Sequence, residues 1–483
     1  MTLRTLTITA GIVAMMGLSV SVSARIRLPE QLGDHCILQQ NTQANLWGEA
    51  AANSKVTVKT SWSKEKYSVT AGADGRWKLA VRTPEGSYEP QTVVISDRDG
   101  SVTLNDVLIG EVWLAGGQSN MEMPLMGFHS CPVEGAVEAI LTSTQYGNRV
   151  REVKIPKTAS PEVEEYVSGR WVETNPATAR EFTAAGWFFA TMLTAALDVP
   201  VGIIACNWGG SAVESWLPKE IVYSYPENTI PNGTHEYVIV PEGWYHHMSN
   251  YVMYNAMLHP VSNYTIKGFI WYQGETNAGL YDYYAERLAT MVSVWRELWG
   301  EGDIPFYEVE LAPWIYGGDG TSGARIREAQ RRAVELIPNS GIATTNDLAY
   351  EYEKDQIHPC QKRQVGERLA LLALNRTYGM SGLQCEGPLY KDMTVEGDRV
   401  IVSFTNTMYD GLSPWHDIQG FELAGEDRVF HPAQAERVDD KVVVTSAEVP
   451  APVAVRYCFR DFQVGNLTGS LGLPAAPFRS DSW

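Results

Sequence analysis

Hydrophobic and polar positions alternate in short segments along residues 25–106, for example in KVTVKTS at 55–61 and again at 92–96. Turn signals such as Asp74-Gly75 separate these segments. Alternation with a period of two residues predicts half-buried β-strands. We therefore predict a small N-terminal β domain over residues 25–106, with a role as a scaffold rather than as a separate sugar-binding module.

The pattern changes at Val107, where apolar runs resemble strands that are buried on both faces of a parallel sheet. Helical periodicity follows between these runs, over residues 181–197 and 281–299, and again around 364–374. Alternating strands and helices indicate an α/β architecture. The candidate strands are residues 107–115, 201–206, 266–272, 305–311 and 341–345.

Short strand patterns return near the end of the chain, at residues 400–404, 441–444 and 453–457. They predict a C-terminal β domain over residues 381–483. The fold class expected for the whole chain is thus α/β: an open, mostly parallel sheet flanked by helices over residues 107–380, with accessory β domains at both ends.

The first 24 residues have the features of a signal peptide. Arg4 precedes an apolar run at 8–22, and Val22-Ser23-Ala24 offers the small residues that a signal peptidase reads. The run is shorter than the roughly 20 residues of a spanning helix. We expect cleavage after Ala24 and export to a periplasmic, extracellular or lumenal compartment, without stable membrane insertion.

Composition narrows the possible partners. The chain has 483 residues, of which 44% are hydrophobic and 20% charged, as in soluble globular proteins. A net charge of -19 and the absence of a dense basic run argue against nucleic-acid binding. The six cysteines show no CxxC spacing, so no metal site is expected, and both disulfides and buried free thiols are compatible with them.

The sharpest local feature is the motif GGQSNM at 116–121, which follows the apolar run at 107–115. It places Ser119 on a tight turn at the carboxyl end of a predicted strand, where ligands bind in open α/β sheets. The motif departs from the G-x-S-x-G elbow of serine hydrolases, because Met121 stands where the second glycine would be. Ser119 is nevertheless the candidate nucleophile.

A serine nucleophile needs a base, which is usually a histidine that an acid orients. The sequence DQIHP at 355–359 spaces Asp355 three residues before His358. In a turn, that spacing allows the carboxylate to bind Nδ1 while Nε2 faces the serine. Because His358 must be neutral to act as a base, activity is expected to fall with pH through its pKa, between about pH 5 and 8.

Acyl transfer also requires donors for the developing oxyanion. Two further strand ends offer them: the segment NWGGS at 207–211 offers a backbone N–H group, and Gln273 offers a side-chain amide. Glycines after a strand often only turn the chain, and Gln273 is also compatible with a helix cap. Their coincidence with Ser119 and His358 favours the catalytic interpretation.

Several long motifs, in one order, resemble the sialate O-acetylesterases of the SGNH hydrolase superfamily. The likeness extends from LPEQLGDHCILQQ near residue 28 to LPAAPF near the end, through GEVWLAGGQSNM, NWGGSAVESW, YNAMLHP, GFIWYQGETN and DQIHP. The resemblance implies a triad of Ser119, His358 and Asp355, an oxyanion hole of the Ser119 N–H, Gly210 and Gln273, and no cofactor.

Some assignments within this resemblance stay open. The third block of the superfamily usually supplies an asparagine where this chain has Gln273, so Asn277 competes with it, and Gly209 competes with Gly210. The substrate is expected to be an O-acetylated sugar, either a sialic acid or another sugar such as xylan.

Two rival functions use other residues. A glycosidase would pair two carboxylates, for which the candidates are Glu122, Glu214 and Glu275. A non-catalytic sugar-binding protein would stack rings on tryptophans, for which the candidates are Trp208, Trp216, Trp244 and Trp271.

Overall fold

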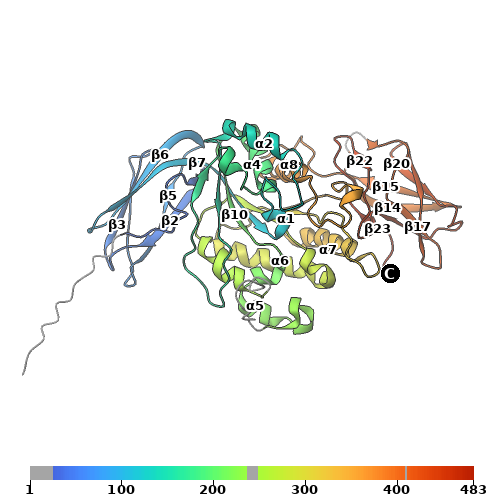
Figure 1. The fold of residues 1–483 in the computed structure, drawn as a ribbon, viewed down its shortest axis with the longest axis horizontal. Coiled ribbons are helices and arrows are strands. Elements are labelled where there is room, and N and C mark those ends of the chain that lie inside the picture. Colours follow the sequence, from blue (N-terminus) through green and yellow to red (C-terminus); the bar gives the residue numbers. More distant parts are fainter. Residues whose placement is uncertain (1–25, 236–248, 408–410) are drawn as a thin grey trace, which may run out of the picture.

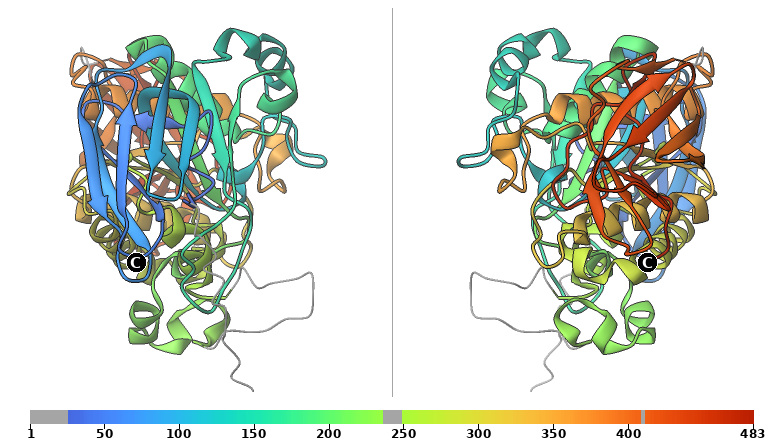
Figure 2. Two further views of the ribbon diagram at one scale, coloured as in Figure 1. Left: turned by 90° about the vertical axis from the view of Figure 1, so that its left-hand side faces the viewer. Right: turned by 90° about the vertical axis from the view of Figure 1, so that its right-hand side faces the viewer.

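The computed structural model describes residues 26–235, 249–407 and 411–483. Three regions follow one another along its longest axis, with the N-terminal strands at one end, an α/β region in the middle and the C-terminal strands at the other end (Figures 1 and 2). The predicted signal peptide and its cleavage site lie outside the described residues. No helix within the described ranges has the length and apolar character needed to cross a membrane.

The central sheet has the strand order β13-β12-β11-β7-β10-β8-β9, in which all pairs are parallel except β8 with β9. The predicted parallel α/β architecture is confirmed. The strands are β7 (Ser101–Gly117), β8 (Val150–Lys154), β9 (Trp171–Glu173), β10 (Val201–Asn207), β11 (Gly268–Tyr272), β12 (Phe306–Val309) and β13 (Ser340–Ala343).

Helices cover both faces of this sheet. The helices α4 (Ala184–Leu197) and α8 (Lys362–Leu372) pack together on one face, and α6 (Tyr281–Trp299) and α7 (Ser322–Leu336) pack together on the other (Figure 1). The predicted helix at 281–299 is confirmed to the residue. The remaining α-helices are short: α1 (Ser119–Glu122), α2 (Ala136–Thr142), α3 (Pro176–Ala179) and α5 (Lys219–Ser224).

The strand β7 is much longer than predicted, and it joins two regions. Its first part pairs with β6 and β1 of the N-terminal region, and its second part pairs with β10 and β11 of the central sheet. One hydrophobic core accordingly runs from Ile26 to Leu374. The N-terminal strands are β1 (Ile37–Gln39), β2 (Gln43–Glu49), β3 (Lys55–Thr60), β4 (Lys66–Thr70), β5 (Arg76–Arg82) and β6 (Ser87–Ser96).

The C-terminal strands enclose a second hydrophobic core, which runs from Val400 to Phe478. An ion pair between Arg479 and Glu328 of α7, at 2.7 Å, ties this region to the α/β region. The strands are β14 (Leu389–Glu396), β15 (Arg399–Thr405), β16 (Leu412–Ser413), β17 (Phe421–Ala424), β18 (Phe430–Pro432), β19 (Gln434–Val438), β20 (Lys441–Thr445), β21 (Ala454–Tyr457), β22 (Thr468–Gly469) and β23 (Phe478–Arg479).

All six cysteines are free thiols, and five of them are buried. Of the two alternatives compatible with the sequence, the structure therefore has the buried thiols. The domain boundaries at 106 and 380 stay a prediction, because β7 and the first core both cross residue 106.

Candidate active site

Ser119 lies where β7 ends and α1 begins. Gly117 has φ +134°, and a Cβ atom there would lie 2.2 Å from the carbonyl oxygen of Tyr272, so the turn requires glycine. The Ser119 side chain is half-buried. Within the described chain, its hydroxyl and its backbone N–H donate no hydrogen bond to another residue, which leaves both groups open to a ligand.

The ends of three parallel strands meet beside this serine. Gly117 pairs with Asn207 of β10 on one side and with Tyr272 of β11 on the other. The segments after β10 and β11 therefore leave the sheet at the level of the Ser119 turn, as the sequence predicted from the rule for open α/β sheets.

The two glycines after β10 differ in their hydrogen bonds. The N–H of Gly209 donates to Oε2 of Glu122 at 2.7 Å, and Nζ of Lys157 pairs with Oε1 of the same carboxylate at 2.6 Å. Gly210, with φ +77°, has an N–H that donates to no residue in the described ranges. Of the two alternatives, Gly210 is thus the one with a donor to offer.

Gln273 and Asn277 belong to one buried cluster, which we call the glutamine network and define as Gln273, Asn277, Glu214 and Arg287. Nε2 of Gln273 donates to the Ser211 carbonyl at 3.1 Å and to Oδ1 of Asn277 at 2.8 Å. Nδ2 of Asn277 donates to Glu214 at 2.9 Å, and Arg287 pairs with Glu214 at 2.5 Å. Both amide protons of Gln273 are therefore engaged within the protein.

His358 lies in the loop before α8, with its imidazole half-buried. Its ring meets the edge of Phe128 at 5.1 Å between centroids, and its Nδ1 lies 4.0 Å from Sγ of Cys131. No described residue bonds its Nε2, which is closed to solvent. Asp355 is exposed and forms no hydrogen bond with His358 in the described structure. Contacts between catalytic residues are often long in the free enzyme and tighten when substrate binds.

The surroundings of His358 lower its pKa to about 4. Burial is the largest cause, the positive charge of Lys362 adds to it, and the carboxylate of Glu122 partly opposes both. The ring is therefore neutral above about pH 4, as a base must be. An acid limb between pH 5 and 8, expected from the ordinary pKa of histidine, is wrong for this environment.

A second cluster joins the serine turn to the histidine loop. We call it the histidine network and define it as Asn120, Glu275 and Lys362. Nδ2 of Asn120 donates to the Ile357 carbonyl at 3.0 Å and to Oε1 of Glu275 at 2.5 Å. Nζ of Lys362 donates to Oδ1 of Asn120 and to the Pro359 carbonyl, both at 2.8 Å. Residues on both sides of His358 are thereby attached to the residue after Ser119.

Motif reasoning missed Lys362 and the contacts of Asn120. A lysine at the start of an amphipathic helix is normally solvated, and only its position four residues after His358 marked it in the sequence. Asn120 stood within the quoted GGQSNM motif, next to the candidate nucleophile.

The residues of the two rival functions have other partners. Glu122, Glu214 and Glu275 are each engaged by a cation or amide of the protein, as described above. Trp216 and Trp271 have no exposed surface, whereas Trp208 is half-buried and Trp244 lies outside the described residues. Stacking of a sugar on Trp216 or Trp271 is excluded by their burial.

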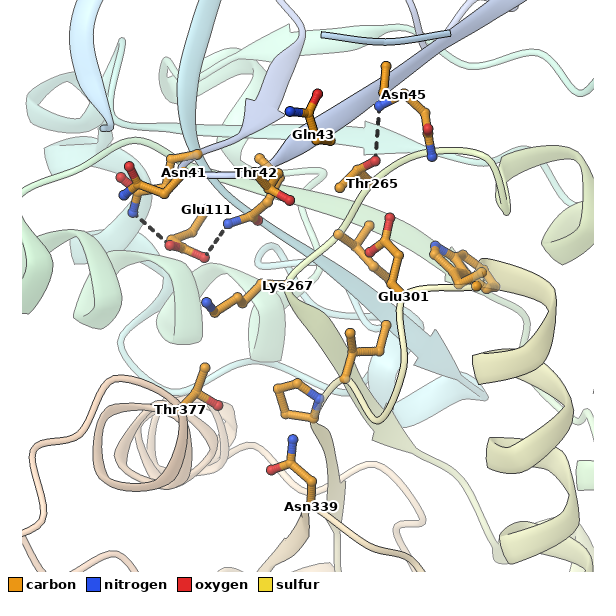
Figure 3. Close-up of a pocket in the computed structure, with 18 of the residues that line it drawn as sticks. Asn41, Thr42, Gln43, Asn45, Glu111, Thr265, Lys267, Glu301, Asn339 and Thr377 are labelled. Carbon is orange, nitrogen blue, oxygen red and sulfur yellow. Dashed lines mark hydrogen bonds between the residues drawn. The ribbon is translucent and has the colours of Figure 1, made fainter. Parts of the chain in front are cut away.

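A polar cavity of about 960 Å³ lies at the other edge of the sheet (Figure 3). Glu111, Lys267 and Glu301 are among its lining residues. None of the residues predicted for catalysis lines it. Its position near the start of β11 separates it from Ser119 by the length of the central strands.

Residues 109–375 match the protein family described as carbohydrate esterase, sialic acid-specific acetylesterase. The match spans more than half of the chain and includes every residue of the candidate site. The chain belongs to this family. It is a carboxylic ester hydrolase, and the resemblance seen in the sequence is confirmed.

Relatives of the esterase are found in animals and bacteria. The sialate O-acetylesterase of Homo sapiens is 27% identical over 430 residues, which cover 80% of this chain and 77% of the relative. That of Mus musculus is 26% identical, with 97% of each chain covered. The structure of a carbohydrate acetylesterase from Xanthomonas citri matches with a TM-score of 0.83 and 33% identity, covering 95% of this chain and 100% of that one.

Proposed function

We propose that this esterase removes O-acetyl groups from sialic acids by acyl transfer through Ser119, with His358 as the base. The observation that carries the proposal is the hydrogen bond between Asn120 and the Ile357 carbonyl at 3.0 Å. Each partner is the immediate neighbour of a proposed catalytic residue, so the bond holds the serine turn and the histidine loop side by side.

In the first step, Nε2 of His358 takes the hydroxyl proton while Oγ of Ser119 attacks the acetyl carbonyl carbon. The N–H groups of Ser119 and Gly210, which donate to no residue in the described ranges, donate to the resulting oxyanion. As the tetrahedral intermediate collapses, His358 returns the proton to the departing sugar oxygen. Water then attacks the acetyl-serine with His358 as base again, and acetate leaves.

Gln273 remains the third predicted contributor to the oxyanion hole. Since its amide protons are bonded to Ser211 and Asn277, we infer that it acts through the segment that carries Gly210. Direct donation to the oxyanion stays a prediction, which paired variants test below.

Asp355 completes the proposed triad. Its support is its spacing of three residues from His358, together with an exposed side chain that forms no bond with another described residue. In the proposal, this carboxylate turns toward Nδ1 when substrate binds, and there it stabilises the imidazolium that forms during attack.

The choice of sialic acid is supported by the animal relatives, whose names specify sialate, whereas the Xanthomonas citri protein is named only as a carbohydrate acetylesterase. Export after cleavage at Ala24 belongs to the same proposal. N-terminal sequencing of the protein secreted by its host tests it, with Arg25 as the expected first residue.

A panel of acetylated glycans tests substrate and nucleophile together. Acetate release is measured with O-acetylated sialic acids, acetylxylan and acetylated hexoses, using the wild type and Ser119→Ala. We expect the highest kcat/KM for the sialic acids, and a loss of roughly 10⁴-fold or more in the variant on every substrate. A higher kcat/KM for acetylxylan than for the sialic acids would contradict the proposed substrate, and an active Ser119→Ala would contradict the mechanism.

A further inference from the structure

The loop that carries His358 is attached to the serine turn by side chains outside the triad. The carbonyl of Ile357, just before the histidine, accepts from Asn120 at 3.0 Å. The carbonyl of Pro359, just after it, accepts from Lys362 at 2.8 Å. Both backbone groups that flank the base are thus fixed by the histidine network.

Lys362 is unusual among these groups because its side chain has no exposed surface. A buried ammonium is costly unless it is bonded and paired. Its Nζ bonds Asn120 and Pro359, lies 5.6 Å from the centre of the Tyr272 ring, and is attracted by the charge of Glu275. The free-energy cost of burying this ammonium is expected at a position where the cation has a function.

We propose that Lys362 and Asn120 are positioning residues, which hold His358 in place for Ser119 by fixing the carbonyls on both sides of it. This inference rests on the proposed function, since it takes His358 as the base. The atoms that react remain those of Ser119, His358 and the acetyl ester, and neither Lys362 nor Asn120 touches them.

The charge of Lys362 gives this role a second consequence. Lys362 and Glu122 are the charged groups that act on the His358 ring, and Cys131 is its thiol neighbour. Lys362 is in turn influenced by Glu275, Glu353, Cys360 and Cys131. Because the ammonium disfavours a second positive charge, it helps to keep the base neutral down to about pH 4.

The test uses the full-length protein and two variants of the network. Lys362→Met removes both the Pro359 bond and the charge, so kcat should fall roughly 10²-fold through misplacement of the base. In the same variant, the acid limb of kcat/KM should move upward from about pH 4, because the positive charge that adds to burial in lowering the His358 pKa is gone, while burial, the larger cause, remains. Asn120→Ala should also lower kcat, but it should leave the limb in place because the charge remains.

The matched control is Arg368→Met. Arg368 is a buried cation of the same helix, but it pairs with Asp347 at 2.6 Å rather than with the histidine loop. This variant should lose thermal stability, while its kcat should stay within about twofold of the wild type and its acid limb should not move, because Arg368 is not among the charges that act on His358. Circular dichroism establishes that each variant is folded.

Two results would overturn the inference: a folded Lys362→Met whose acid limb stays near pH 4, or a wild-type kcat in either network variant. If Lys362→Met does not fold, Asn120→Ala decides alone, since it removes no charge. Ser119→Ala and His358→Ala are measured beside them. Activity in those two would refute the proposed function itself, whereas their inactivity with unaffected network variants would refute only the positioning role.

Discussion

Two buried polar networks lie on either side of the Ser119 turn, and they differ in how completely their groups are satisfied. In the glutamine network, the amide of Gln273 uses both protons and accepts from Tyr284, and Glu214 is bonded by Arg287 and Asn277. In the histidine network, Oε2 of Glu275 is closed to solvent and has no described donor. The ammonium of Lys362 has three N–H groups to donate, but only two oxygens of the described residues, those of Asn120 and Pro359, accept from it.

This difference indicates different roles: one network supports the backbone beside the site, and the other affects the pKa of His358. A fully bonded network is held in one arrangement, since any movement would leave a buried polar group unpaired. The glutamine network therefore provides a rigid base for the segment with Gly210. The histidine network holds the ammonium of Lys362 next to the base, with two described acceptors for its three N–H groups. Its positive charge lowers the pKa of His358.

The largest effect on stability is expected from Arg287→Met, which breaks the glutamine network. It leaves Glu214 with a buried, unpaired charge, so the free energy of unfolding should fall by about 3–5 kcal/mol. Urea denaturation measures it. The matched control is Arg296→Met on the same helix, whose partner Asp303 is exposed, and it should lose less. Equal losses in the two variants would contradict the rigid-support role.

A smaller effect is expected from Gln273→Ala and Asn277→Ala, compared by kcat on one acetyl ester. If Gln273 acts through the segment that carries Gly210, both variants should lower kcat to a similar degree, roughly 10-fold, since each opens the same bonded network. A loss of about 10²- to 10³-fold in Gln273→Ala alone would instead show direct donation to the oxyanion.

The smallest expected effect is on the pH dependence of kcat and kcat/KM, which reports the charges around His358. His358 has a lowered pKa, so kcat/KM, which reports the free enzyme, should be lost only as the pH falls through about 4. If Asp355 meets the imidazolium in the bound complex, the acid limb of kcat should lie higher, because a carboxylate raises the pKa of its partner.

Asp355→Asn tests that pairing. It should lower the acid limb of kcat while leaving the limb of kcat/KM unchanged, since Asp355 is exposed in the free enzyme and is bonded to none of the residues that the structure describes. Identical limbs of kcat in wild type and variant would remove Asp355 from the triad.

The sequence predicted the parts of the fold that depend on local patterns. The helix at 281–299 repeats apolar residues at helical spacing, and the predicted strands at 201–206 and 266–272 are apolar apart from Lys267, so their burial could be inferred directly. The strand β8 escaped prediction because the buried charged residues Arg151 and Glu152 interrupt it, and β9 because it has only three residues, two of which are exposed. Arg151 in β8 is stabilised by Asp106 at 2.7 Å, a contact that only the tertiary structure supplies.

The candidate site shows the same division. Ser119 and His358 could be proposed from a turn motif and a spacing, and the structure does place their segments together. The burial of Lys362 and the bonding of Gln273 depend on residues that are far apart in sequence, such as Asn120 with 362 and Ser211 with 273. No local pattern indicates that an amide is already engaged or that a lysine is buried.

The most direct test of the central claim is to trap the acyl-enzyme. Wild type mixed with excess acetylated substrate is quenched in acid within one turnover and digested, and the peptide that contains residue 119 is analysed by mass spectrometry. The proposed mechanism predicts the added mass of one acetyl group on Ser119, and none on the same peptide of His358→Ala. Rapid acetate release with the acetyl group on another residue, or with no acetylated peptide at any quench time, would contradict it.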